Sequence, residues 1–217
     1  MNKPTKITHD EQINNREENQ RETKMQKPND IANVNMKGHL LIRDKNSGEV
    51  LLDKMNAIHF ENMSLALARS LGHKSTGPIE KIYYGNGGST VNGIGEVTYL
   101  PANTVGQSAT LYNATYSKIV DDLNTSNADT ENNKIEISHV SGNLFSDLVV
   151  TTTLDFGEPS AQDNFDSAGS TEDDFVFDEI GLFDYAGNMV THVVFSPLQK
   201  SLNREIEIRY TLRIQMV

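Results

Sequence analysis

The clearest pattern in the sequence is an alternation of apolar and polar residues near its C-terminal end, over residues 204–214. Alternation with a period of two predicts a β-strand that turns one face to the core and the other to solvent or a partner. The apolar positions of this strand are Ile206, Ile208, Tyr210, Leu212 and Ile214.

Further strands are predicted where short runs rich in β-branched and aromatic residues lie between turn-forming residues. These runs occupy residues 79–84, 115–120, 134–140, 147–155, 175–183 and 189–195. A β-hairpin is also predicted, because the apolar segments 39–43 and 49–53 flank a cluster of turn formers at residues 44–48.

The sequence predicts one helix. Phe60, Met63, Leu67 and Leu71 recur at spacings of three and four residues, and Gly72 follows as a C-terminal stop. Short strands, polar loops and a single helix indicate a mainly β fold, an antiparallel β-sandwich with one helix. Residues 33–217 are long enough to form this sandwich as one domain.

Residues 1–32 differ from the rest of the chain. They hold six Lys or Arg and six Asp or Glu, and their few apolar residues are widely spaced. Such a segment cannot bury enough surface to offset its ordering entropy, so we expect an extended or disordered N-terminal arm. The arm is expected to bind neighbouring subunits; the alternative is that it packs on its own domain. Its candidate partner-binding residues are Ile7, Ile13, Met25 and Ile31.

Composition and charge exclude several functional classes. The chain of 217 residues has no Cys, which excludes disulfides and Cys-ligated metals. Its net charge of −11 argues against binding nucleic acid or an anionic membrane. Because the N-terminus lacks an apolar signal region and no apolar run approaches about 20 residues, we expect a soluble, non-secreted protein without a membrane segment.

The acidic residues concentrate in one part of the chain. Residues 135–199 contain twelve Asp or Glu and no Lys or Arg. Clustered carboxylates are the ligands that Ca²⁺ prefers, but no EF-hand spacing is present. A solvated acidic loop at residues 157–174, whose charge steers docking onto a basic partner, is therefore favoured over a calcium site.

No motif predicts a catalytic residue, a cofactor or a metal. The six His are far apart, and no G-x-S-x-G motif is present. His139 and His192 fall in predicted strands, where a hydrogen-bonded structural role is expected. Glu179 is close to Gly181, which suggests a buried acid, although a carboxylate at a turn or strand edge is favoured.

The glycine-rich sequence Gly85-Asn86-Gly87-Gly88 follows a predicted strand, as a phosphate-binding loop does. No helical pattern or Lys-Ser/Thr pair comes after it, and its spacing is not G-x-G-x-x-G. A tight turn that needs positive φ is therefore the favoured interpretation.

A family resemblance rests on these glycines together with the segment Phe177-Asp178-Glu179-Ile180-Gly181-Leu182-Phe183-Asp184, Gly187 and the strand that leads to Lys200. Residues 79–215 resemble the proximal domain of tail-collar fibre proteins of contractile-tailed bacteriophages, and residues 193–204 resemble virion proteins of large tailed phages. The matching glycines Gly85, Gly87, Gly88, Gly181 and Gly187 are structural residues. Gly181 is expected to allow close backbone approach, and residues 184–187 to close a hairpin.

The resemblance implies a non-enzymatic structural protein of the virion, assembled in the host bacterial cytoplasm. It would be an adaptor at the tail, baseplate or neck that attaches fibres or neighbouring subunits, as a homo-oligomer. Unlike the family, this chain ends at Val217 without a repetitive shaft and carries the N-terminal arm. Two alternatives remain open: a capsid decoration or cement protein, and a carbohydrate-binding or polysaccharide-degrading tail protein. The latter is disfavoured by the absence of Trp and an aromatic share of 7%.

Overall fold

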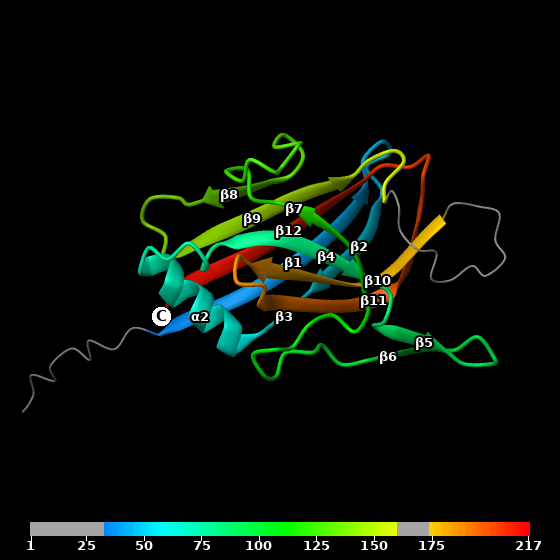
Figure 1. Cartoon of the computed structure of the whole chain (residues 1–217), viewed down its shortest axis with the longest axis horizontal. Coiled ribbons are helices and arrows are strands. Elements are labelled where there is room, and N and C mark those ends of the chain that lie inside the picture. The colour runs from blue at the N-terminus through cyan, green and yellow to red at the C-terminus, as the bar shows by residue number, and fades with distance from the viewer. Residues whose placement is uncertain (1–32, 160–173) are drawn as a thin grey trace, which may run out of the picture. The chain divides into compact units, whose positions relative to one another are not determined.

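The computed structural model describes residues 33–159 and 174–217, and the folded unit comprises Val34–Val217. Within these residues the chain forms two five-stranded antiparallel sheets, a short hairpin and one helix, α2 (Phe60–Leu71) (Figure 1). Sheet one contains, in spatial order, β2 (Val50–Met55), β1 (Val34–Asp44), β12 (Ile206–Met216), β9 (Phe145–Leu154) and β8 (Lys134–Ser138). Sheet two contains β3 (Ala57–Ile58), β11 (Met189–Ser201), β10 (Asp174–Asp184), β4 (Ile79–Gly85) and β7 (Ala114–Ile119). The separate hairpin consists of β5 (Ser89–Val91) and β6 (Val97–Tyr99).

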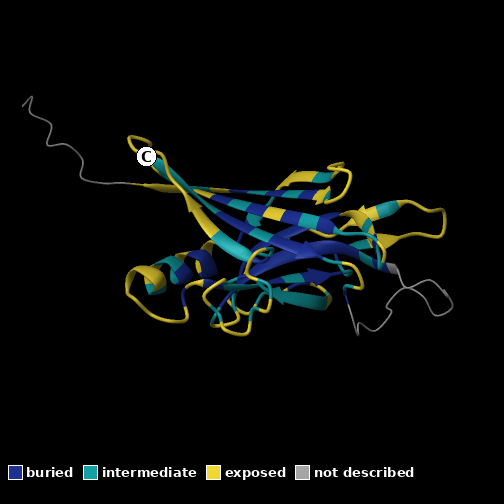
Figure 2. Cartoon of the chain, turned by 90° about the horizontal axis from the view of Figure 1, so that it is seen from above, coloured by how far each residue is buried: buried dark blue, intermediate teal, exposed yellow. Residues whose placement is uncertain are grey.

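The two sheets pack face to face around one hydrophobic core. Figure 2 shows buried segments concentrated on the facing sides of the two layers. Leu40 and Ile42 of β1 and Ile208 of β12 meet Phe177 and Leu182 of β10 in this core. The prediction of a mainly β antiparallel sandwich with one helix is therefore confirmed.

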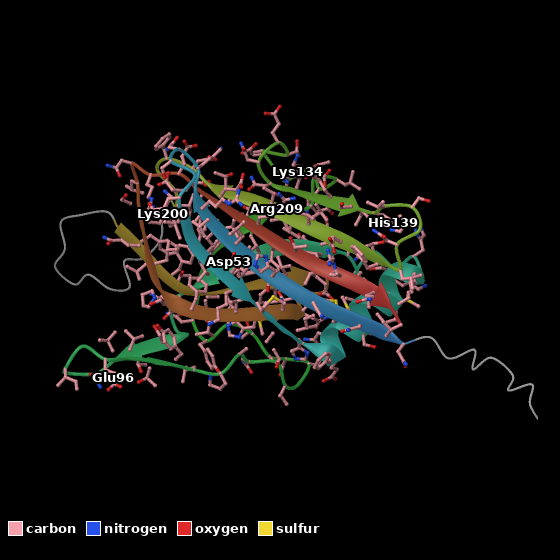
Figure 3. The ribbon with its side chains drawn as sticks, turned by 180° about the vertical axis from the view of Figure 1, so that it is seen from behind. Asp53, Glu96, Lys134, His139, Lys200 and Arg209 are labelled. Atoms are coloured by element: carbon pink, nitrogen blue, oxygen red, sulfur yellow. The ribbon has the colours of Figure 1, made fainter. Side chains whose placement is uncertain are left out.

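Buried and more exposed residues alternate along strand β12, as its sequence pattern predicts. It pairs with β1 on one side and β9 on the other. Ile206, Ile208 and Tyr210 are fully buried, whereas Arg209 lies on the outer surface of sheet one, as Figure 3 also shows. Only Ile214 departs from the pattern, because it is half-buried near the end of the strand.

The predicted hairpin and helix are both present. The turn between β1 and β2 is closed by the Asp44 side chain, which accepts hydrogen bonds from the backbone N–H groups of Asn46 and Ser47. Helix α2 begins after His59, whose side chain accepts from the N–H of Asn62, and it ends before Gly72. The left-handed conformation that follows belongs to His73, with φ 54°, and not to the glycine.

Strand β11 is longer than the sequence predicts, because it continues through Pro197. Phe177 pairs with Leu198 and Glu179 pairs with Val194, so one residue of β10 lies opposite three residues of β11. This β-bulge accommodates a proline that has no N–H to donate to a regular ladder. The predicted end of the strand at residue 195 marks the start of this irregular stretch.

No helix in the described part of the chain is long and apolar enough to span a membrane.

Candidate functional site

A long loop, residues 86–113, leaves sheet two after β4 and returns to it at β7; we call it the 86–113 loop. Its two ends lie side by side, because Gly85 pairs with Ala114 and the N–H of Asn86 donates to the carbonyl of Asn113. The loop contains the β5–β6 hairpin. Its residue Leu111 packs against Phe183 and Met189 of sheet two. The loop therefore lies against β11 and against β10, the strand that carries Asp178 and Glu179.

The carboxylate of Glu179 holds both ends of the 86–113 loop. Its Oε1 accepts hydrogen bonds from the backbone N–H of Gly87 at 3.1 Å and of Asn113 at 2.8 Å. Its Oε2 accepts from the N–H of Tyr112 at 3.0 Å and contacts Nε2 of His192 at 3.0 Å. The Glu179 side chain is fully buried, so this carboxylate is enclosed by four nitrogen donors.

His192 is a neutral donor in this arrangement. Its Nδ1 accepts a hydrogen bond from the backbone N–H of Asn103 at 2.8 Å, so that nitrogen carries no proton. The ring proton then lies on Nε2 and is donated to Glu179. Glu179 is consequently a buried anion stabilised by N–H dipoles, as in anion-binding nests, and not by an opposite full charge.

A second histidine holds the middle of the loop. His59 is fully buried, and its Nε2 lies 2.9 Å from the carbonyl oxygen of Gly106. The side-chain amide of Asn62 donates to the carbonyl of Gln107 at 3.2 Å. His59, which caps the N-terminus of α2, and His192 of strand β11 thus both bind the loop backbone.

Asp178 binds the start of the β5–β6 hairpin. Its Oδ1 accepts from the N–H of Gly88 at 2.9 Å, and its Oδ2 accepts from the N–H of Ser89 at 2.7 Å and from the Ser89 hydroxyl. Consecutive residues of a regular strand point to opposite faces. The bulge between Phe177 and Glu179 allows both neighbouring carboxylates to reach the same loop.

The two carboxylates have opposite pKa shifts. Burial raises the pKa of Glu179, but the hydrogen bonds from His192 and from the backbone of Asn113, Tyr112 and Gly87 outweigh burial, so its pKa is lowered. Burial also raises the pKa of Asp178, and there the bonds from Ser89 and Gly88 do not compensate. The nearby Glu179 charge adds to the rise. Glu179 is therefore the stable anion of the pair.

The prediction for the Gly85–Gly88 sequence is wrong in its physical reason. None of its three glycines has positive φ. Their role is to leave space: a Cβ on Gly85 would lie 2.5 Å from the Asn113 carbonyl oxygen and 2.5 Å from Oε1 of Glu179. A Cβ on Gly87 would lie 2.8 Å from the Asn113 nitrogen, and one on Gly88 would lie 2.9 Å from Cγ1 of Val194. The glycines therefore allow close approach of the backbone to the other end of the loop, to Glu179 and to β11.

The other two predicted structural glycines behave as expected. A Cβ on Gly181 would lie 2.9 Å from the carbonyl oxygen of Thr191, which confirms the close backbone approach. Gly187 has φ 79° in the turn that joins β10 to β11. The N–H of Asp184 donates to the carbonyl of Asn188, and this bond closes the predicted hairpin.

Two predictions about polar residues need correction, and one is confirmed. Glu179 is a buried acid inside a central strand, not a turn or edge carboxylate, because the 86–113 loop covers it. His139 lies beyond β8, which ends at Ser138, and is exposed, although it is hydrogen-bonded as expected, with Nδ1 3.1 Å from the Phe145 carbonyl oxygen and 3.0 Å from the Ser146 hydroxyl. His192 is a hydrogen-bonded residue of a strand, as expected.

The remaining predicted sites lie partly or wholly outside the described residues. Ile7, Ile13, Met25 and Ile31 of the arm belong to residues 1–32, which are not described. Most of the acidic loop at 157–174 falls in the undescribed range 160–173. Among the residues that are described, no group of three or more His, Cys, Asp or Glu side chains could hold a metal ion.

The 86–113 loop presents apolar side chains to solvent. Ile94 is 88% exposed at the tip of the β5–β6 hairpin. The tip is ordered by Asn92, whose side-chain oxygen accepts from the N–H groups of Ile94 and Glu96, and by Gly95 with φ 84°. Figure 3 labels Glu96 on this hairpin, away from the two sheets. The other exposed apolar residues of the loop are Val91, Tyr99, Leu100, Val105 and Tyr112.

The pattern of the sequence did not predict this surface. An Asn-Gly pair and a second glycine surround Ile94, and that combination is a signal for a hairpin turn. The short strands on either side have no extended alternation, so the usual evidence for strands is weak there. An ordered turn that displays an apolar side chain loses little entropy when a partner binds. The 86–113 loop is therefore the candidate interaction surface.

The Glu179 anchor predicts a pH-dependent loss of stability in a conservative variant. In Glu179→Gln the new amide would face the N–H donors of Tyr112 and His192, so we expect about 2–4 kcal/mol of destabilisation at pH 7. Because the folded pKa of Glu179 lies below its ordinary 4.5, its contribution is fully present above that value and is lost as pH falls through the folded pKa. Urea unfolding from pH 7 to pH 3 should show the difference between wild type and variant shrinking only below about pH 4.5. Exposed Glu136→Gln is the control and should change stability by less than about 0.5 kcal/mol; a similar effect of both variants would contradict the anchor.

The close approach at Gly85 predicts a second effect on stability. Gly85→Ala places a methyl group against backbone and carboxylate, so we expect it to destabilise the fold by about 1–3 kcal/mol. Gly93→Ala is the matched control, because nothing lies within 4 Å of the added Cβ and its φ is not positive. Urea titrations of both variants measure the difference, and equal midpoints would refute the steric role of Gly85.

Comparisons of this chain with protein families, with curated proteins and with solved structures find no match.

Proposed function

We propose that this chain is a non-enzymatic structural protein of a tailed bacteriophage virion. It acts as an adaptor at the tail, baseplate or neck and attaches fibres or neighbouring subunits. The setting comes from the resemblance of residues 79–215 to tail-collar fibre domains. The binding role is argued from the 86–113 loop.

One observation carries the binding role: buried polar side chains hold the backbone of a loop whose apolar side chains are exposed. Glu179 accepts four hydrogen bonds, and His192 uses both ring nitrogens. Groups engaged in this way have no free position for a substrate. Meanwhile Ile94 and Val105 are each 88% exposed on the same loop. This combination suits docking of a rigid surface onto another protein better than it suits catalysis.

The N-terminal arm supplies the second part of the proposal. A segment of about 30 residues can extend up to about 100 Å, which is enough to cross a neighbouring subunit. In this proposal residues 1–32 order on adjacent copies and add area to the interface, so the protein assembles as a homo-oligomer. The same features also suit a decoration protein on the capsid, which differs only in its neighbours.

The proposed role of the arm predicts that its deletion impairs assembly but not folding. A variant that lacks residues 1–32 should keep its fold, because the described core lies within Val34–Val217. Its incorporation into assembling particles should fall, since the arm no longer binds adjacent subunits. Circular dichroism measures the fold, and quantitative mass spectrometry of purified particles measures incorporation against full-length protein. Undiminished incorporation refutes the arm's role, and a particle reconstruction with contacts to major capsid subunits alone refutes the tail location.

The hairpin tip predicts a binding defect without a folding defect. Ile94→Asp should change the free energy of unfolding by less than about 0.5 kcal/mol, because the side chain is exposed. Loss of an apolar side chain that is buried on docking should weaken the interface about 10- to 100-fold. Competition between tagged variant and wild type for incorporation into particles measures this loss. Leu123→Asp, at a residue that is 87% exposed outside the loop, is the control; equal incorporation of both variants would contradict docking through the tip.

A carbohydrate-binding role is the second candidate, because two exposed tyrosines lie on the 86–113 loop. Tyr99 is 48% exposed and Tyr112 is 40% exposed. Their hydroxyl groups already bond to Ser196 and to the carbonyl of Pro101. Binding of the isolated protein to a glycan array, abolished by Tyr99→Ala and Tyr112→Ala, would favour this candidate over the adaptor.

A further inference from the structure

A second exposed apolar surface is a groove between helix α2 and the first residues of β1. It has a volume of about 380 Å³ and is lined by nine residues, of which only Ser64 is polar. Buried Met63 and half-buried Leu67 line the helix side of the groove, and Val34 and Met36 line its strand side. The groove is thus a continuous apolar surface along the helix.

The groove is open to solvent in the folded unit. Phe60 and Leu71, at the two ends of α2, are 78% and 89% exposed, and Val34 is 51% exposed. Ser64 and Ala68, which lie between these ends, are also exposed. Apolar side chains that gather along one groove are typical of a surface that a partner covers.

The chain itself supplies a suitable occupant. Residues 1–32 precede the described fold, and the chain enters that fold next to Val34, which lines the groove. Every copy of the protein therefore carries both a groove and a segment of 32 residues that precedes the fold in the sequence. Ile13 is separated from Val34 by 21 positions, a distance that an extended chain can span up to about 70 Å. Ile31 is only three positions from Val34 and reaches about 10 Å.

The spacing of Ile7 and Ile13 matches the groove. Residues six apart in an extended chain point to the same side and lie about 20 Å apart. Helix α2 has 12 residues and is about 18 Å long. An extended segment laid along the helix would place one isoleucine near each end of the groove. Of the residues between them, Thr8, Asp10 and Gln12 would face solvent, whereas His9 and Glu11 would lie on the same side as the isoleucines, over the middle of the groove.

We propose that Ile7 and Ile13 of one copy bind in the α2 groove of a second copy. This inference rests on the proposed function, in which the arm orders on neighbouring subunits, and it names the receptor for that arm. The mode is an extended peptide that inserts two apolar anchors along a helix. Burial of these anchors supplies the affinity, and the distance between them supplies the register.

Binding of a synthetic arm peptide tests the contact directly. A fluorescent peptide of residues 1–20 is titrated onto protein that lacks residues 1–32, with anisotropy as the measurement. Ser64→Arg combined with Ala68→Arg fills the groove from exposed positions and should weaken binding about 10- to 100-fold. Ile7→Asp with Ile13→Asp in the peptide should have the same effect. Glu61→Arg is the matched control, because it changes the net charge by the same amount, is on the same helix and lies outside the groove lining.

A mixing experiment tests whether the arm of one copy binds the groove of another. The arm-deleted protein has a groove and no arm, and the full-length Ser64→Arg/Ala68→Arg protein has an arm and a blocked groove. Neither should self-associate in analytical ultracentrifugation, while their mixture should form mixed complexes. Peptide binding without mixed complexes would mean that the arm, when attached to its own fold, does not bind the groove of another copy, and it would overturn the inference.

Different experimental results would contradict this inference and the proposed function. If the groove-blocked protein assembles like wild type while arm deletion prevents assembly, the groove is not the receptor and the proposed adaptor role stands. Equal binding of the peptide to the blocked, control and unmodified grooves also overturns the inference. If arm deletion leaves assembly unchanged, both the inference and the arm's part in the proposed function fail.

Discussion

The buried carboxylate of Glu179 is the constraint on which the candidate site depends. A charge removed from water has to be compensated, and here the compensation comes from N–H groups at both ends of the 86–113 loop and from His192. If the loop left the sheet, the Glu179 carboxylate would lose the loop N–H groups that compensate its charge. Strand β10 and the loop form one unit for this reason.

This constraint explains features that otherwise look unrelated. Gly85 is required because a Cβ would lie too close to the Glu179 carboxylate and the Asn113 carbonyl, and Gly87 and Gly88 are required because a Cβ would lie too close to Asn113 and Val194. The bulge at Pro197 lets Asp178 and Glu179 reach the same loop. The glycine-rich sequence and the two carboxylates together hold the loop on the sheet.

Two of the places where the folded unit exposes apolar side chains differ in geometry. One is the ordered hairpin tip around Ile94, and the other is the groove along α2. Each has a different geometry: a projecting side chain suits insertion into a partner, whereas a groove suits reception of a segment. In the proposed function, a chain that both inserts and receives would connect several neighbours, as an adaptor in a symmetric assembly does.

The sequence by itself determined the elements that local periodicity specifies. The alternation in β12, the spacing of apolar residues in α2 and the turn formers at 44–48 each act over a few residues, so the mainly β fold with one helix could be predicted. The tertiary structure alone decided the burial of Glu179, the steric role of Gly85 and the display of Ile94. Burial and close approach depend on which distant segments come into contact, here residues 86–113 with β10 and β11. Local sequence patterns extend over only a few residues and do not show which distant segments these are.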